Sequence, residues 1–270
     1  MRQPCLVASD LDGTLLDPSE RVSARTAERA RAVDAAGVPL VLVTGRPPRW
    51  VPRIVGELGV AGPVVCSNGA VHYDAATDTV VGSDPLAPET LREATGALRR
   101  ALPGCSFGVE RSTGAARDRV DEQFLGEPDF HRCWPNPDLR VTPVEKFVGA
   151  PADKLLVLHE HLSSARMAAV AEQVLGEGVR VTYSTGSGLL ELSAAGVDKA
   201  SGLARVAGQL GVAAEDVLAF GDMPNDVPML EWAGHGVAMG NAHPEVRQTA
   251  DEVTADNAAD GVAAVLERWW

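Results

Sequence analysis

Two aspartates near the start of the chain, Asp10 and Asp12, have the type and spacing that metal or acid–base chemistry requires. The apolar run 5–8 predicts a buried strand that leads into the acidic, glycine-containing turn 10–14. Side chains at i and i+2 of a strand share a face, so the two carboxylates could point the same way. Two like charges so close disfavour joint ionisation unless a cation or a shared proton compensates. The pair therefore indicates a functional turn, and the alternative is an ordinary acidic turn.

Polar turns also follow three other apolar runs that predict strands. These turns are residues 44–46, 67–69 and 221–226. In open α/β sheets, ligands bind outside the carboxyl ends of the strands, so we expect the four turns to form one site. Asp10, Asp12 and Asp222 would bring their carboxylates together there. Hard oxygen ligands without histidine or cysteine favour Mg²⁺ over zinc.

The same turns supply groups that could bind an anion. The Thr44 hydroxyl, Arg46 and Lys199 could hold phosphoryl oxygens by charge and hydrogen bonding. Each residue also has a plainer interpretation. Lys199 could be a surface lysine at a helix start, Arg46 could pair with a neighbouring acid, and Asn68 could be a turn residue, because Asn-Gly is a common turn signal.

The elements that must position these turns alternate between strands and helices. Strands are predicted at 39–43, 64–66, 217–220 and 236–239, and helices at 24–36, 47–58, 200–210 and 261–268. Ser23 is expected to cap the first of these helices, and Gly37 follows its end. The alternation implies a parallel sheet with helices on its faces.

The middle of the chain has a different pattern. Strands are predicted at 106–110, 154–158, 179–184 and 189–192, and helices at 88–102 and 163–175. The alternation of the last strands suits an antiparallel sheet with one exposed face. The Gly- and Pro-rich tract 114–151 is expected to form surface loops. We therefore predict a core domain of residues 1–82 and 191–270, and an inserted α+β cap domain of residues 83–190.

Composition excludes some classes of partner. Across 270 residues, 24 Lys and Arg face 37 acidic residues, for a net charge of −13, which argues against nucleic acid or an anionic membrane as partner. The start of the chain lacks a signal segment, and no apolar run approaches the ~18 residues of a membrane span. We expect a soluble cytoplasmic protein. The four cysteines show no C-x-x-C spacing, and a zinc site or disulfide at Cys105 and Cys133 stays open.

Four motifs together resemble a known family. Asp-Leu-Asp-Gly-Thr-Leu-Leu from Asp10, Val-Thr-Gly-Arg ending at Arg46, Lys199, and Gly-Asp-Met-Pro-Asn-Asp ending at Asp226 resemble the signature motifs of the haloacid dehalogenase (HAD) superfamily. The position of the insertion, with the stretches 67–70 and 257–263, is similar to the Cof-type phosphatases of subclass IIB. The resemblance implies a Rossmann-like core with an inserted α+β cap. It also implies a Mg²⁺-dependent phosphatase of small phosphomonoesters, with sugar phosphates as the default substrates.

The resemblance also assigns roles to residues. Asp10 resembles the nucleophile that forms an aspartyl phosphate, and Asp12 the acid that protonates the leaving alcohol and then activates water. Mg²⁺ would be held by Asp10, the backbone carbonyl of Asp12, and Asp222. Phosphate binding would fall to Thr44, Gly45, Lys199 and Asn225. Arg46, Asn68 and Asp226 would lie beside the metal or the substrate.

Other functions fit the same motifs. A phosphotransferase or phosphomutase on this fold would pass the aspartyl phosphate to another hydroxyl, and sequence does not separate it from a hydrolase. A non-enzymatic phospho-switch is disfavoured by Asp12, since an acid–base group so near shortens the phosphorylated state. A binding module that has lost catalysis would not need the full motif set. The cap residues that select the substrate are not evident, with Arg111, Arg117, Arg132 and Lys146 as candidates.

Overall fold

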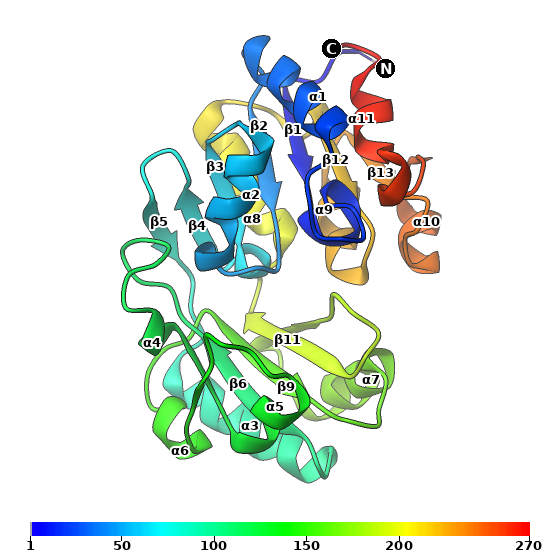
Figure 1. The fold of residues 1–270 in the computed structure, drawn as a ribbon. Helices are drawn as coiled ribbons and strands as arrows, with labels where there is room; N and C mark the ends of the chain where they lie inside the picture. The colour runs from blue at the N-terminus through cyan, green and yellow to red at the C-terminus, as the bar shows by residue number, and fades with distance from the viewer. Residues whose placement is uncertain (1) are drawn as a thin grey trace.

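Two β-sheets formed by different parts of the chain organise residues 2–270, which this computed structural model describes (Figure 1). We call the larger one the core sheet and the smaller one the cap sheet. In order across the core sheet, the strands are β14 (Glu252–Val253), β13 (His235–Ala238), β12 (Val217–Gly221), β1 (Leu6–Ser9), β2 (Leu40–Val43), β3 (Pro63–Cys66), β4 (Val71–Asp74) and β5 (Thr79–Ser83). Both chain ends lie at the end of the molecule far from the cap sheet.

The central strands of the core sheet are parallel, as the alternation of strands and helices predicts. β1 pairs in parallel with β12 on one side and with β2 on the other, and β2 pairs in parallel with β3. Every residue of β1 and β2 is buried, as expected for strands covered on both faces. The carboxyl ends of these strands meet at the edge that faces the cap sheet (Figure 1). The predicted Rossmann-like sheet is confirmed.

Helices form two layers on the core sheet. They are α1 (Ala24–Ala35), α2 (Val51–Leu58), α8 (Lys199–Leu210), α9 (Val227–Trp232), α10 (Pro244–Thr249) and α11 (Gly261–Leu266). α1 packs against α2 and α11, while α9 packs against α8 and α10. Right-handed crossovers place the two groups on opposite faces of the sheet. The side chain of Ser23 accepts a hydrogen bond from the backbone N–H of Thr26, which confirms the predicted cap of α1.

The core sheet continues into two antiparallel strands, β4 and β5, that sequence patterns did not predict. Asn68 and Gly69 turn the chain from β3 into β4 with φ of 55° and 101°, a region that asparagine and glycine tolerate best. A Cβ on Gly69 would come within 2.0 Å of the backbone oxygen of Asp198, so this turn lies directly against the start of α8. The Asn-Gly signal thus predicted the turn but not the strand pairing that follows it.

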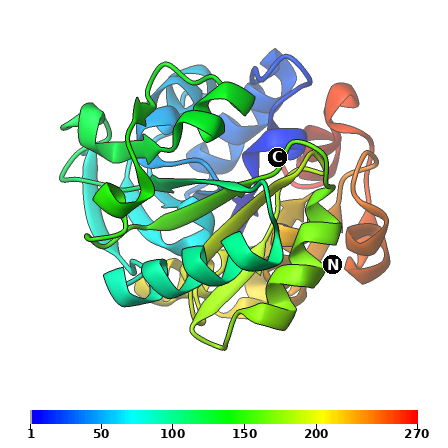
Figure 2. The same cartoon turned by 90° about the horizontal axis from the view of Figure 1, so that it is seen from below.

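The cap sheet is built from the middle of the chain. Its strands in order are β10 (Val179–Thr182), β11 (Leu189–Ala194), β9 (Lys154–Leu158), β6 (Ser106–Glu110), β7 (Phe124–Gly126) and β8 (Arg140–Val141). Its helices are α3 (Pro88–Ala101), α4 (Val120–Gln123), α5 (Pro128–Cys133), α6 (Val144–Phe147) and α7 (Ser164–Val174). α3 and α7 lie side by side across the outer face of the sheet (Figure 2). The inserted α+β unit is confirmed.

The prediction of surface loops over residues 114–151 is wrong, because that tract contains β7, β8 and three short helices. Prolines begin helices here instead of interrupting them: Pro128 is the first residue of α5. An aromatic group holds the tract together, with the Phe130 and Trp134 rings 5.7 Å apart and Phe124 against both. Pro128 therefore marks the start of a helix and not a loop. The aromatic residues that pack this tract together are spread along it, so no single local pattern predicts them.

The predicted antiparallel arrangement of residues 179–184 and 189–192 is confirmed by the pairing of β10 with β11, but the expectation of one exposed face is wrong for β11, whose residues 190–193 are all buried. On β9, Leu155 and Val157 pack with the helices, whereas Lys154 and Leu156 lie on the opposite face and are buried as well. That second face lies against the carboxyl edge of the core sheet, so its polar side chains are enclosed. Alternation in a sequence predicts two faces of a strand but not what covers each of them.

Two connections join the sheets, residues 84–87 between β5 and α3 and residues 195–198 between β11 and α8. β11 remains paired with β10 through Ala194, so the cap sheet extends past residue 190, where we expected the second boundary. Among residues 2–270, no helix has both the length and the apolar character that crossing a bilayer requires.

Candidate active site

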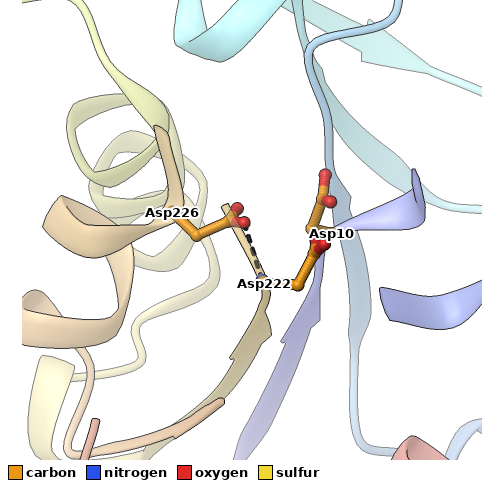
Figure 3. A group of neighbouring side chains, drawn as sticks. All are labelled: Asp10, Asp222 and Asp226. Carbon is orange, nitrogen blue, oxygen red and sulfur yellow. Dashed lines mark hydrogen bonds between the residues drawn. The ribbon is translucent and has the colours of Figure 1, made fainter. Parts of the chain in front are cut away.

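Three carboxylates and one ammonium meet where β1 and β12 end. Asp10 follows β1, Asp222 follows β12, and Asp226 ends the short turn Pro224–Asp226; their oxygens lie within 4.8 Å of one another (Figure 3). Lys199 Nζ, which is fully buried, lies 2.6 Å from Asp10 Oδ1 and 2.6 Å from Asp226 Oδ1. Of the three carboxylates predicted to meet, Asp10 and Asp222 do so, whereas Asp226 and not Asp12 is the third member of the group.

Hydrogen bonds leave particular carboxylate oxygens for a ligand. Asp226 Oδ2 accepts from the backbone N–H groups of Asp222 and Met223, both at 2.9 Å, so Asp226 is engaged by Lys199 and the backbone. Thr14 Oγ1 donates to Asp222 Oδ1 at 3.0 Å. Among residues 2–270, no hydrogen bond reaches Asp10 Oδ2 or Asp222 Oδ2. These two oxygens are the ones available to a cation.

Gly13 makes this arrangement of carboxylates possible. Its φ of +74° lies in the left-handed region, and a Cβ there would meet Asp222 Oδ2 at 2.2 Å. The carbonyl oxygen of Gly13 accepts a hydrogen bond of 2.8 Å from Asn241 Nδ2, which holds the turn in place. The turn after β1 therefore approaches Asp222 as closely as a residue without a side chain allows.

Burial and neighbouring charges set the protonation of the site. Burial raises the pKa of Asp10 well above its usual value; Lys199 opposes this, while the carboxylates of Asp226 and Asp222 add to it. Burial, followed by the charge of Asp226, raises the pKa of Asp222 to about 7. Burial alone would lower the pKa of Lys199, but Asp10 and Asp226 raise it and hold the ammonium charged. The one ammonium of Lys199 lies among three carboxylates, so these four side chains can carry more negative than positive charge.

Asp12 does not share a strand face with Asp10, so that expectation is wrong. β1 ends at Ser9, and Asp12 lies in the following turn, where its side chain is 50% exposed. Arg46 binds both oxygens of the Asp12 carboxylate, with Nε 2.8 Å from Oδ2, and its guanidinium also lies 3.2 Å from Glu20. Arg46 therefore pairs with neighbouring acids, which was the plainer of its two interpretations.

The other predicted residues follow β2, β3 and β12. Thr44 is buried, and its Oγ1 accepts from the backbone N–H of Arg46 at 3.0 Å, a bond that does not use the hydroxyl proton. Asn225 Nδ2 donates to Asn68 Oδ1 at 3.1 Å, and Asn68 Nδ2 donates to Glu191 Oε2 at 3.0 Å. Because a carboxylate only accepts, Glu191 fixes the orientation of both amides and turns Asn225 Oδ1 away from Asn68.

Sequence reasoning missed a group of buried charges between the sheets, which we call the buried charge cluster: Arg49, Glu110, Lys154 and Glu191. Arg49 binds Glu110 at 2.9 Å, and Lys154 lies 2.8 Å from Glu191 and 3.2 Å from Glu110. Lys154 Nζ also donates to the carbonyl oxygen of Gly45 at 2.7 Å, which joins the cap to the turn after β2. The sequence does contain one sign of this cluster, because charged residues stand at positions 110, 154 and 191 within otherwise apolar runs predicted to be strands.

A cavity of about 670 Å³ lies between the two sheets and joins these groups. Its lining includes Asp10, Asp12, Gly45, Arg46 and Asn225 from the core, together with the buried charge cluster. Of the four basic residues considered in the insertion, Arg117 is the one that lines it. Two tryptophans, Trp50 and Trp134, also contribute. A small molecule placed here would contact the acidic site and the cap together.

Comparison with known proteins gives the family. A family model described as haloacid dehalogenase-like hydrolase matches residues 7–266. The chain belongs to the haloacid dehalogenase-like hydrolases. The hydrolase is 28% identical over 277 residues to the 5-amino-6-(5-phospho-D-ribitylamino)uracil phosphatase YitU of Bacillus subtilis, covering 99% of this chain and 98% of that protein. It is 27% identical over 276 residues to the pyridoxal phosphate phosphatase YbhA of Escherichia coli, with 97% of each covered.

The fold comparison agrees with the sequence comparison. The HAD subclass IIB sugar phosphatase BT4131 superimposes on the hydrolase with a TM-score of 0.80 and 20% identity, covering 98% of each chain. At that identity the likeness concerns the fold. The resemblance to the HAD superfamily and its Cof-type subclass is confirmed: the chain belongs to a hydrolase family, and relatives named as phosphatases match it over nearly their whole length.

Proposed function

We propose that this hydrolase is a Mg²⁺-dependent phosphatase that cleaves small phosphomonoesters through a phosphorylated Asp10. The observation that carries the proposal is the buried Lys199 at 2.6 Å from Asp10 Oδ1, beside two carboxylate oxygens without partners among residues 2–270. A buried carboxylate whose pKa the neighbouring lysine lowers against the effect of burial, next to a place for a cation, suits attack on phosphorus.

The residues present fit a magnesium ion. Asp10 and Asp222 would hold it through their available oxygens, with the backbone carbonyl of Asp12 as a further ligand, because Mg²⁺ is usually bound by one or two carboxylates. Asp226 would instead position Lys199 and the turn after β12. When bound, Mg²⁺ neutralises charge on the phosphoryl oxygens.

Different side chains of the protein would carry out the separate steps of the reaction. A carboxylate oxygen of Asp10 attacks phosphorus, the bond to the leaving oxygen breaks, and Asp12 gives that oxygen its proton. Asp12 then takes a proton from water, which attacks the aspartyl phosphate and releases inorganic phosphate. Thr44, Gly45, Lys199 and Asn225 would hold the phosphoryl oxygens. Arg46 would orient Asp12, and Asn68 would orient Asn225.

We also propose that the core and cap are separate domains, with the second connection at residues 195–198. Lys154 and Glu191 reach from the cap to Gly45 and Asn68 of the core, so closure of the cap would help to order the phosphate site. The named relatives act on a ribitylaminouracil phosphate and on pyridoxal phosphate. We infer that the substrate is a small phosphorylated metabolite, with sugar phosphates and cofactor phosphates as the first classes to test.

Metal dependence is the first test of this function. The hydrolase is expected to release phosphate from p-nitrophenyl phosphate with Mg²⁺, to lose activity after exhaustive treatment with EDTA, and to regain it when Mg²⁺ is restored. Release of inorganic phosphate without an added acceptor would separate a hydrolase from a phosphotransferase. Full activity after chelation would contradict the proposal.

Affinity for Mg²⁺ should depend on pH because Asp222 must be ionised to bind it. Its pKa of about 7 means that binding below that pH displaces a proton. The apparent Kd for Mg²⁺ is expected to fall by up to ~10-fold per pH unit as the pH rises from 5.5 toward 7, and then to level off. Calorimetric titration of the substrate-free hydrolase measures this. A Kd independent of pH would show that Asp222 is not a ligand.

Loss of the proposed acid should slow turnover without preventing binding. Asp12→Asn is expected to lower kcat by about 10²–10⁴-fold, since one proton-transfer group is lost. Asp129→Asn is a matched control, because Asp129 also pairs with an arginine, Arg132 at 3.4 Å, but lies outside the cavity. Steady-state kinetics with an alkyl phosphate, whose leaving alcohol needs a proton, make the comparison. Equal kcat values in the two variants would exclude Asp12 as the acid.

A further inference from the structure

We propose that Asn241 and Asn257 are positioning residues for the acid, Asp12. Their side chains hold the turn 11–15, which carries Asp12, and we call the pair the asparagine clamp. The inference rests on the proposed function, in which Asp12 protonates the leaving oxygen. It adds two residues, from the far end of the chain, that keep this acid in place.

The turn 11–15 has an irregular backbone. Asp12 has a ψ of 123° and Gly13 a φ of +74°, so neither residue is helical. Two backbone hydrogen bonds that each span five residues run across the turn: Leu15 donates to Asp10 at 3.3 Å and Leu16 donates to Leu11 at 2.9 Å. Backbone turns of this width are rare and are found mostly at functional sites. Because two consecutive residues interrupt the regular bonding, the shape of the turn depends partly on contacts from outside it.

The asparagine clamp supplies these contacts. Asn241 Nδ2 donates to the carbonyl oxygen of Gly13 at 2.8 Å, and Asn257 Nδ2 donates to the carbonyl oxygen of Leu16 at 2.7 Å. Asn241 Oδ1 accepts from the backbone N–H of Asn257 at 2.9 Å. Since an amide oxygen only accepts, this last bond fixes which end of the Asn241 amide faces the turn. The clamp therefore holds two carbonyl groups that follow Asp12 closely in the chain.

The two segments that carry the clamp are packed closely against each other. A Cβ on Gly240 would meet Asp256 Oδ1 at 2.2 Å, and a Cβ on Gly261 would meet the carbonyl oxygen of Ala255 at 2.1 Å. The backbone N–H of Gly240 also donates to the carbonyl oxygen of Ala255 at 3.2 Å. A supporting residue that is itself held by packing keeps its partner within a narrow range of positions. The clamp thus has the rigidity that positioning requires.

Asp12 depends on this support more than Asp10 does. Asp12 is bonded directly to Gly13, so a shift of the Gly13 carbonyl moves Asp12 within the cavity that both aspartates line. Asp10 directly follows β1, and its backbone N–H donates to the carbonyl oxygen of Phe220 at 3.0 Å, a contact independent of the clamp. A misplacement of ~1 Å can cost a catalytic group about 10²-fold in rate. Loosening the turn should therefore impair proton transfer to the leaving oxygen more than attack by Asp10.

Two esters that each carry one aromatic ring test this difference at saturating Mg²⁺. The leaving alcohol of benzyl phosphate needs a proton, whereas p-nitrophenolate departs without one. kcat/KM includes only the steps through departure of the leaving group. In Asn241→Ala, the ratio of kcat/KM for benzyl phosphate to that for p-nitrophenyl phosphate is expected to fall by at least ~10-fold. Asn257→Ala should lower this ratio too, and it provides the test if Asn241→Ala does not fold.

Arg29→Ala is the matched control, with urea unfolding to verify that each variant is folded. Arg29 Nη1 also donates to a distant backbone carbonyl, that of Trp270 at 2.8 Å, but its partners lie outside the turn 11–15. The ratio should therefore stay unchanged in this variant. Equal losses for both esters in the clamp variants, or no loss for either, would overturn the inference, since a purely structural role affects both esters alike. An unchanged ratio in Asp12→Asn would instead overturn the acid role in the proposed function.

Discussion

Replacing Asp10 by asparagine is expected to lower kcat by at least ~10⁴-fold, because losing the nucleophile of a covalent mechanism removes the pathway itself. The side-chain amide has the size of the carboxylate but cannot attack phosphorus. Lys199 keeps Asp226 as its partner at 2.6 Å, so the fold should persist. Burial raises the pKa of the Asp10 carboxyl, so a negative charge at this position is unfavourable in the folded protein. Removing that charge by the Asn substitution should therefore not unfold the chain.

Two measurements check this result. Steady-state kinetics give kcat, and mass spectrometry of acid-quenched protein should find a phosphorylated form in the unaltered hydrolase but not in Asp10→Asn. Asp34→Asn, an exposed change on α1, is the control and should retain both activity and the phosphorylated form. Near-normal turnover in Asp10→Asn, with an unchanged far-UV spectrum, would contradict covalent catalysis through this residue.

Lys199→Met is expected to destabilise the folded protein by about 3–5 kcal/mol, because it leaves buried carboxylates without their counter-charge. Lys199 and Asp226 are both fully buried, and Nζ is the shared partner of Asp10 and Asp226. Methionine has a similar length and is apolar, so the lost charge, and not lost volume, dominates the effect. Activity should fall as well, since Asp10 would take up a proton more readily.

Urea unfolding of the metal-free protein measures this change as a shift of the transition midpoint. Lys146→Met is a control for the substitution itself, because Lys146 is exposed on the cap. An unchanged midpoint for Lys199→Met would show that Asp10 and Asp226 are not both ionised beside it. In that case Lys199 would not be the group that keeps the nucleophile charged.

Sequence patterns predicted the elements that position the site, because those elements depend on local signals. The apolar run before Asp10 predicted β1, and glycines marked helix ends: Gly59 and Gly211 adopt the left-handed conformation that ends α2 and α8. Parallel strands place their carboxyl ends at one edge, so Asp10 and Asp222 could be brought together without any coordinates. The HAD motifs added the family, which the matches confirm.

Other features depend on contacts between distant segments, and only the tertiary structure decided them. The positions of Glu110, Lys154 and Glu191 within strands predicted two faces, but only the docking of the cap on the core enclosed the second face. The ion pair of Asp12 also depends on tertiary structure. The turn that contains Gly13 takes Asp12 out of the strand, and its carboxylate there meets the guanidinium of Arg46. Alternation along a strand determines which side chains share a face. Whether that face meets water or another domain depends on residues far away in the chain.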